Sequence, residues 1–374
     1  MRVISQQLTS SLEHLPESSA PNDNVDLVLV HGNSYSMEQP SLLENLCQAY
    51  PCACIAGISA AGELLNGEAF ENSIVYSAIE FDHTTVRQAR VNLNEDREDE
   101  YESGLKLAKQ LLEDDLAAVI IYSEGLSVDC DEIVKGARQV IDSEVPFIGG
   151  LASDVNAIEH TVVMDREGVY DDAVVALGIY GKRIEVDVIT SNFDQKGIEV
   201  EITSSEGNII YEINGKPALS EYENLILEQS SQKLNSRLLH PLLILDEESN
   251  QAMYCRSIHA FDTESNSLLS AGTVPEGRAR LISVIDLKDL IRDADSISSN
   301  FNNQPTEFAL VVSCAGRKTA MDDEWPQEAT VIQKNLGETP SIGFYSFGEI
   351  GMSYLDSSTI LHNHTLTIAA FTEK

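Results

Sequence analysis

The sequence predicts an α/β fold of two lobes, built from repeated βαβ-like units around mixed sheets and joined by an antiparallel central region. Three glycine-bounded bends are the main observation, at 54–63, 146–154 and 340–351. In each bend apolar residues lead to a glycine, small residues follow, and a carboxylate comes last. An apolar strand and a helical segment precede each bend, and another strand follows it. This self-similarity predicts three related units.

The flanking strands can be placed from their apolar runs. The strands before the bends are expected at 26–33, 117–125 and 308–316, and those after them at 74–81, 174–180 and 366–371. The first set ends in small or polar residues. Because ligands of open α/β sheets bind at the carboxyl ends of strands, these ends are candidate binding positions.

Bulk composition limits the classes of function. The 374 residues suggest two domains, and 43% hydrophobic residues are ample for a core. The formal net charge of −37 argues against binding to nucleic acid or to anionic membranes. No secretory signal pattern and no apolar run of about 18 residues is visible, and the six cysteines are typical of reduced thiols. A cytoplasmic location is therefore expected.

The remaining elements follow in chain order. Helices are expected at 41–50, at 100–112 and at 129–141, where Asp129 is a plausible N-cap residue. From Glu159 onward, short runs separated by turn residues predict antiparallel strands, with a hairpin turn at 206–208. Further strands are expected at 162–164, 168–170, 174–180, 184–190, 198–204, 209–213, 241–245, 253–260 and 268–272, and further helices near 220–227 and 287–296.

Polar residues near the third bend predict a pocket for an organic acid or an amino acid. Arg317 follows a buried strand, and its guanidinium could hold a carboxylate through two hydrogen bonds. Glu349 could pair with an amine and Tyr345 could stack on the ligand. Ser346, Cys314 and Arg278 complete the predicted ligand-binding set. The alternative is that Arg317 and Glu349 simply pair with each other.

No motif predicts catalysis or nucleotide binding. The segment 57–62 resembles a nucleophile elbow, but its second glycine comes one residue late. There is no phosphate-binding loop. We therefore do not expect an enzyme. An iron–sulfur cluster would need about four thiolates, and only the fold could gather Cys52, Cys54, Cys130, Cys255 and Cys314.

Several segments resemble the FIST family of bacterial signal-transduction sensors. They are 57–63 and 146–154 in an N-terminal part, and 214–218, 274–277, 313–317, 343–350 and 362–365 in a C-terminal part. The resemblance implies a FIST N-like domain at 25–200 and a FIST C-like domain at 201–374. It implies a sensor that binds a small ligand and signals to a partner protein such as a histidine kinase. Homo-oligomers are compatible with the sequence.

The resemblance to stand-alone members of this family implies a haem-based nitric-oxide sensor. Candidate axial ligands are His31, His259, His362, His364, Cys314 and Tyr345. His362 is favoured as the metal ligand because it lies in the family-like segment 362–365. The alternatives are a sensor without a cofactor that binds a metabolite such as an amino acid, and an iron–sulfur or thiol-based redox sensor.

Overall fold

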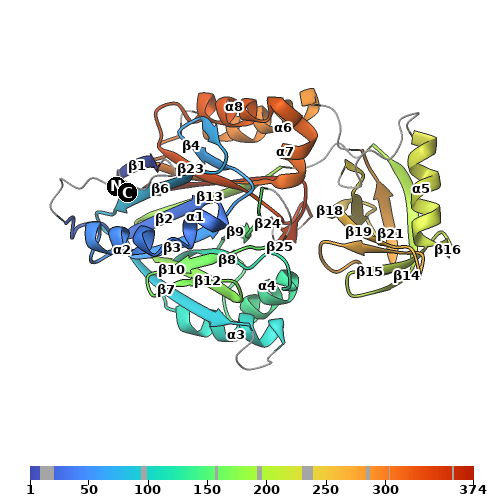
Figure 1. Ribbon diagram of the computed structural model, residues 1–374, viewed down its shortest axis with the longest axis horizontal. Helices are drawn as coiled ribbons and strands as arrows, with labels where there is room; N and C mark the ends of the chain where they lie inside the picture. Colours follow the sequence, from blue (N-terminus) through green and yellow to red (C-terminus); the bar gives the residue numbers. More distant parts are fainter. Residues whose placement is uncertain are drawn as a thin grey trace.

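The computed structural model describes residues 1–8, 21–93, 99–155, 159–191, 196–229, 239–283, 287–302, 304–355 and 358–374. Figure 1 shows a body that holds both chain termini and a smaller lobe to one side. We call the second part the inserted lobe, because the described residues between 198 and 281 form it, between β13 and α6 of the body.

The body contains three six-stranded mixed sheets with a common strand order. The first has the order β1 (Arg2–Leu8), β6 (Ile74–Glu80), β2 (Leu27–Gly32), β3 (Cys54–Ser59), β10 (Val163–Asp165) and β11 (Val169–Tyr170). The second is β7 (Thr85–Asn92), β12 (Ala173–Tyr180), β8 (Leu116–Ser123), β9 (Phe147–Leu151), β24 (Glu349–Met352) and β25 (Thr359–His362). The third is β13 (Ile184–Thr190), β26 (Leu366–Glu373), β22 (Phe308–Cys314), β23 (Ser341–Ser346), β4 (Glu63–Leu65) and β5 (Glu68–Phe70).

Strand direction repeats as closely as strand order. The two middle strands of each sheet, β2 and β3, β8 and β9, and β22 and β23, are parallel. Their outer neighbours pair with them in antiparallel fashion. The short hairpin that follows each second parallel strand joins a different sheet. Unit 1 donates β4–β5 to the third sheet, unit 2 donates β10–β11 to the first, and unit 3 donates β24–β25 to the second. The exchange interlocks the three units.

The three bends are spatial counterparts, as the sequence predicts. Gly57, Gly149 and Gly343 each lie opposite the corresponding residue of the first parallel strand, namely Val30, Ile121 and Val311. Glycine is required most clearly at Gly149, where φ is +144° and a Cβ atom would lie 1.8 Å from the carbonyl oxygen of Ile121. The repeated βαβ-like units are therefore confirmed.

The sheets share one core. Leu29, Ile120 and Leu310, one from the first parallel strand of each unit, belong to the same buried cluster. Continuous apolar runs, like those of the first parallel strands, are typical of sheets buried on both faces. Helices cover the outside, where α3 packs on α4 and α6 packs on α8. The body helices are α1 (Ser34–Met37), α2 (Pro40–Ala49), α3 (Glu100–Leu111), α4 (Cys130–Arg138), α6 (Leu287–Ser298), α7 (Ala315–Met321) and α8 (Pro326–Leu336), with 3-10 turns η2 (Ser299–Phe301) and η3 (Asp322–Glu324).

The inserted lobe is a single antiparallel sheet with its own core. Its strands are β14 (Ile198–Glu206), β15 (Ile209–Ile213), β16 (Lys216–Pro217), β17 (Leu242–Leu245), β18 (Ala252–Arg256), β19 (Ile258–Asp262), β20 (Ser267–Ser270) and β21 (Gly277–Leu281). Helix α5 (Ala218–Gln229) packs on this sheet. The expected hairpin turn is present at Gly207, where φ is +57°.

The predicted antiparallel region began too early in the chain. The strands from β10 to β13, at 163–190, belong to the three body sheets, and the antiparallel lobe begins only at β14. These strands are antiparallel to their neighbours, so short-range pattern alone cannot separate them from the lobe. None of the helices in the described ranges is long and apolar enough to span a membrane.

Candidate functional site

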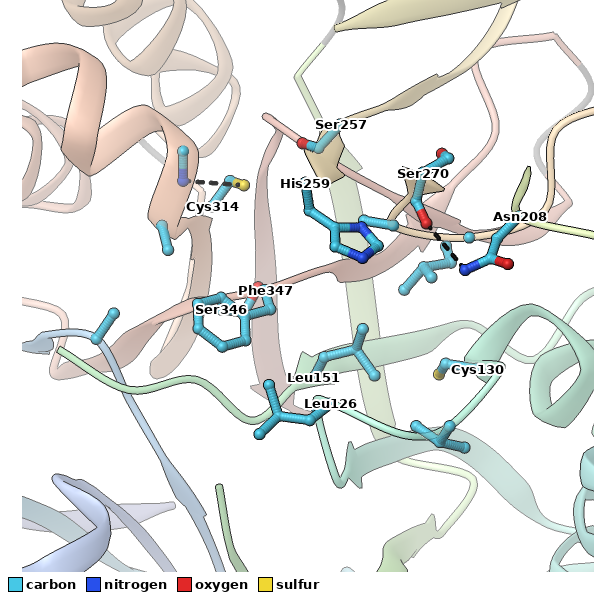
Figure 2. A pocket seen from close by; sticks show the side chains of 18 of the residues that line it. Leu126, Cys130, Leu151, Asn208, Ser257, His259, Ser270, Cys314, Ser346 and Phe347 are labelled. Atoms are coloured by element: carbon cyan, nitrogen blue, oxygen red, sulfur yellow. Dashed lines mark hydrogen bonds between the residues drawn. The ribbon is translucent and has the colours of Figure 1, made fainter. Parts of the chain in front are cut away.

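A cavity of about 870 Å³ lies between the body and the inserted lobe, and we call it the interlobe cavity. Its volume falls in the usual range for small-molecule sites, about 300–1,000 Å³. Figure 2 shows side chains of both parts surrounding it. The lining residues are Ala61, Glu100, Gly125, Leu126, Ser127, Val128, Asp129, Cys130, Leu151, Asp154, Val155, Gly207, Asn208, Ser257, His259, Ser270, Ala271, Gly272, Cys314, Ala315, Gly316, Lys318, Thr319, Ser346, Phe347 and Leu361.

The body contributes the carboxyl ends of parallel strands. Residues after β8 and β9 form one part of the wall, and residues after β22 and β23 form another. This is the expected location for a ligand site in an α/β sheet. Side chains fix the loop backbone at these ends. Glu124, 3% exposed, accepts hydrogen bonds from the amides of Leu126 at 2.6 Å and Ser127 at 2.9 Å. Cys314 Sγ accepts one from the amide of Gly316 at 3.3 Å.

The two walls of the cavity differ in chemistry. Much of the body wall is apolar and includes Leu126, Leu151, Phe347 and Leu361. The lobe wall contains hydrogen-bonding side chains, namely Asn208, Ser257, His259 and Ser270. Figure 2 shows the His259 ring extending from β19 into the cavity. An occupant would therefore meet an apolar surface on one side and polar groups on the other.

Two of the predicted ligand-binding residues, Cys314 and Ser346, line the interlobe cavity. Glu349 lies behind them and is fully buried. Its Oε1 accepts a hydrogen bond from Ser346 Oγ at 2.6 Å, and its Oε2 accepts bonds from the Thr365 amide at 3.0 Å and Thr365 Oγ1 at 2.9 Å. Burial raises the pKa of Glu349 to about 7, although these hydrogen bonds oppose the rise. The carboxyl therefore supports the cavity wall from behind and does not itself line the cavity.

The predicted carboxylate clamp at Arg317 is corrected by the structure. Arg317 is fully buried, and its Nε donates to Glu328 Oε1 at 2.9 Å. Its other nitrogens bind Asp293 at 2.6 Å and the Leu290 carbonyl at 3.1 Å. Tyr345 also belongs to this network, because its hydroxyl donates to Glu328 Oε2 at 2.9 Å. Burial alone would lower the pKa of Arg317, but the carboxylates of Glu328 and Asp293 raise it by a larger amount. The pKa is therefore raised overall, and the guanidinium stays charged. The expected alternative, a pair between Arg317 and Glu349, is also wrong.

Arg278 and His362 lie away from the cavity wall. Arg278, on β21, is 3.8 Å from Glu199 on β14, and its side chain is 43% exposed. His362 is fully buried, with Nε2 2.8 Å from the Met352 carbonyl oxygen and its ring 4.8 Å from that of Tyr354. Burial lowers the pKa of His362 to about 3, so the imidazole is neutral. His362 is therefore enclosed by the protein and does not line the interlobe cavity.

His31 is a core residue and does not face the cavity. Its Nδ1 lies 3.0 Å from the Gly343 carbonyl oxygen, so this nitrogen carries the proton, and its Nε2 accepts from the Tyr122 hydroxyl at 2.8 Å. The ring packs against Phe344. Because His31, Tyr122 and Gly343 come from units 1, 2 and 3, this contact joins all three units.

The fit of a haem or metal centre depends on the donors that face the cavity. Among the candidate axial ligands, His259 and Cys314 line it. Leu126, Leu151 and Phe347 offer the apolar slot that a porphyrin needs. Among the described lining residues, Lys318 is the one lysine or arginine that could pair with the carboxylate groups of a haem. Within the described ranges, no three His, Cys, Asp or Glu residues gather in a metal-binding group. The site therefore fits the iron ligand and ring of a haem better than its acidic groups.

Sequence reasoning missed the lobe wall. Asn208, Ser257 and Ser270 are isolated polar residues in short strands or turns, and no motif distinguishes them. His259 was one of six candidate ligands. Phe347 carried the clearest signal, because it follows the parallel strand β23 at its carboxyl end.

The three interlocked units, the inserted lobe and the cavity between them define a modular α/β protein with a ligand-sized interlobe site. Comparison with known proteins identifies the class. The FIST N domain model matches residues 26–216 and the FIST C domain model matches residues 218–352. The chain therefore belongs to the FIST family, whose domains are associated with sensing in signal transduction.

Curated relatives are uncharacterised proteins. One from Methanocaldococcus jannaschii is 24% identical over 236 residues, which are 55% of this chain and 45% of the relative. One from Mycobacterium tuberculosis is 25% identical over 217 residues, covering 54% of this chain and 56% of the relative. One from Mycobacterium bovis is 24% identical over 236 residues, 60% of each. The chain thus spans about half of the length of the curated relatives that it matches.

Proposed function

We propose that this FIST protein is a sensor whose small-molecule ligand binds in the interlobe cavity and whose signal is a changed contact between inserted lobe and body. The proposal rests on one observation, that the two walls of the cavity come from different parts of the protein. Lobe residues such as His259 and body residues such as Phe347 line the same cavity. Any occupant therefore contacts both parts, and its binding energy can favour one arrangement of them.

Specific contacts beside the cavity transmit such a change. Arg256 of the lobe forms a buried ion pair with Asp131 of helix α4 at 2.5 Å. The Ser257 amide donates to Asn363 Oδ1 at 3.1 Å. Both Ser257 and the helix start at Cys130 belong to the cavity wall. A ligand that displaces either wall residue would alter these contacts and so the surface offered to a partner such as a histidine kinase.

The proposal can be tested with a filtered bacterial metabolite extract. The full chain is incubated with molecules below about 1 kDa, separated by gel filtration, and analysed by mass spectrometry for bound compounds. Ala271→Trp places a large side chain in the cavity and should abolish retention. The control, Leu227→Trp, changes an exposed residue of α5 and should retain the same compound. Retention that is equal in both variants, or absent in the unmodified protein, would refute the cavity as the sensor site.

A second candidate is a haem-based nitric-oxide sensor that regulates a histidine kinase, and the position of His259 favours it. A bound haem would supply an iron that coordinates nitric oxide. His259 would hold the iron, and Leu126 and Phe347 would contact the ring. Titration with haemin should then give an intense absorption band at about 400 nm that His259→Ala shifts or removes. His362→Ala is the control and should leave the band unchanged. A protein that is colourless once the excess haemin has been removed would exclude this candidate.

A further inference from the structure

We propose that the ligand of the interlobe cavity is an uncharged molecule with a flat one- or two-ring system and hydrogen-bonding groups along one edge. This inference rests on the proposed function and names the chemical class of its ligand. It follows from the charges at the wall, from the placement of polar groups, and from the size of the cavity.

Two charged groups at the wall, Lys318 and Asp129, are already engaged by the protein. Lys318 Nζ donates to the Ala61 carbonyl oxygen at 2.5 Å, forms an ion pair with Glu71, and lies over the Trp325 ring. Asp129 Oδ1 accepts from the amide of Asp131, and Asp129 Oδ2 accepts from Thr273 Oγ1. An anionic ligand would have to break the contacts of Lys318 to find a counterion.

The remaining charges at the wall disfavour an anion further. Asp154 and Glu100 add two carboxylates, and Asp154 Oδ1 accepts from the amide of Val155 at 2.6 Å. Asp129, Asp154 and Glu100 thus outnumber the single ammonium group of Lys318. Arg256 and Arg317, the buried guanidiniums nearest in sequence to wall residues, are fully engaged by protein acceptors. The wall therefore offers an organic acid no guanidinium clamp, and this is the physical reason that the predicted amino-acid pocket is not supported.

The uncharged part of the wall is divided between apolar and polar faces. Phe347, Leu126 and Leu151 on the body present an aromatic ring and two branched chains, which suit the face of a ring system. Asn208 and Ser257 on the lobe present an amide and a hydroxyl, which suit a donor and an acceptor on the ring edge. A volume of about 870 Å³ exceeds the needs of a single amino acid.

His259 is the residue that should discriminate among such ligands. Its imidazole extends from β19 into the cavity and can donate or accept according to its tautomer. Sites that hydrogen-bond a ligand edge reject analogues that cannot return the bond. His259→Phe keeps a flat ring of similar size and removes the hydrogen-bonding nitrogens.

Three bicyclic probes of similar shape and one acyclic probe test the proposal on the full chain. Isoquinolin-1-one is a neutral bicycle with a donor and an acceptor on one edge. 1-Naphthoate and 1-naphthylmethylammonium carry a negative and a positive charge on the same rings, and L-glutamate is a zwitterion without rings. Binding is measured by titration calorimetry and by the shift of the unfolding temperature.

We expect isoquinolin-1-one to bind at least about tenfold more tightly than the other three, a difference of about 1.4 kcal/mol. His259→Phe should weaken its binding about tenfold, and His83→Phe, at an exposed position, should not. Tighter binding of either charged naphthalene or of glutamate would overturn the inference, as would the absence of binding by isoquinolin-1-one. If the unmodified protein retains a metabolite from the extract and Ala271→Trp abolishes that retention, the sensor proposal stands while the proposed ligand class is wrong.

Discussion

Replacement of Arg256 by methionine tests whether a buried ion pair holds the inserted lobe against the body. The guanidinium is 2% exposed and its partner Asp131 is 7% exposed. Arg256 also donates to the Thr273 and Leu361 carbonyl oxygens at 3.1 and 2.7 Å. Methionine keeps much of the volume, so the variant removes the charge and its hydrogen bonds and leaves Asp131 without a partner.

The expected loss in the free energy of unfolding is determined by the carboxyl of Asp131, which the variant leaves unpaired. Removal of one partner from a buried pair typically costs about 3–5 kcal/mol. Burial raises the pKa of Asp131 and Arg256 opposes the rise, so loss of Arg256 raises that pKa further. The carboxyl can then take up a proton, which limits the loss to about 3 kcal/mol. Because the folded variant binds more protons than the unfolded chain, the loss should grow as the pH rises above the ordinary pKa of an aspartate, about 3.9.

Urea unfolding followed by far-ultraviolet circular dichroism measures this change at several pH values. Arg292→Met is the matched control, because Arg292 pairs with Asp289 on the surface of α6 and its side chain is 73% exposed. The control should cost no more than about 0.5 kcal/mol. A loss below about 1 kcal/mol in Arg256→Met, or one that does not depend on pH, would refute the argument that this pair fixes the lobe.

Three further predictions concern the body. Tyr122→Phe leaves Nε2 of His31 without its hydrogen-bond donor and should lower the free energy of unfolding by about 1–3 kcal/mol in urea melts, while an unchanged midpoint would show that the bond contributes nothing. Burial lowers the pKa of His31 to about 3 and raises that of Glu63 to about 8. Stability should therefore fall as pH drops below about 6.5, because the unfolded histidine gains a proton, and also as pH rises from about 4.5 to 8, because the folded Glu63 retains one. Thermal melts of Glu63→Gln should show a flatter alkaline limb, and the same slope as the parent would contradict the assignment. Gly149→Ala should prevent correct folding, because its Cβ atom would collide with a backbone oxygen, whereas Gly207→Asn, in open space at φ +57°, should fold normally by circular dichroism.

Much of the body could be predicted from local patterns. The strand around Val30 is a continuous apolar run, and the bends at Gly57, Gly149 and Gly343 share one arrangement of apolar, small and acidic residues. These patterns reflect a local requirement, since each bend follows a strand buried on both faces and needs a glycine beside the neighbouring strand. The expected helix at Glu100 and the cap at Asp129 were found because capping is decided within one turn.

The candidate site could be predicted only in part. Cys314 and Ser346 lie at the cavity wall, and their positions at strand ends can be located from sequence. Arg317 was misplaced, because two residues that are distant in sequence, Asp293 and Glu328, enclose it. A buried arginine in an ion network and an arginine that grips a ligand have the same local sequence.

The sequence by itself determined the units, their order and the bends that end their strands, because hydrophobic period and glycine chemistry act over a few residues. Only the tertiary structure decided that each unit lends its hairpin to another sheet and that the inserted lobe closes a cavity over strands β9 and β23. Those features depend on contacts such as Arg256 with Asp131, which lie 125 residues apart in the chain. Such pairing follows from the packing of whole sheets, which no local pattern encodes.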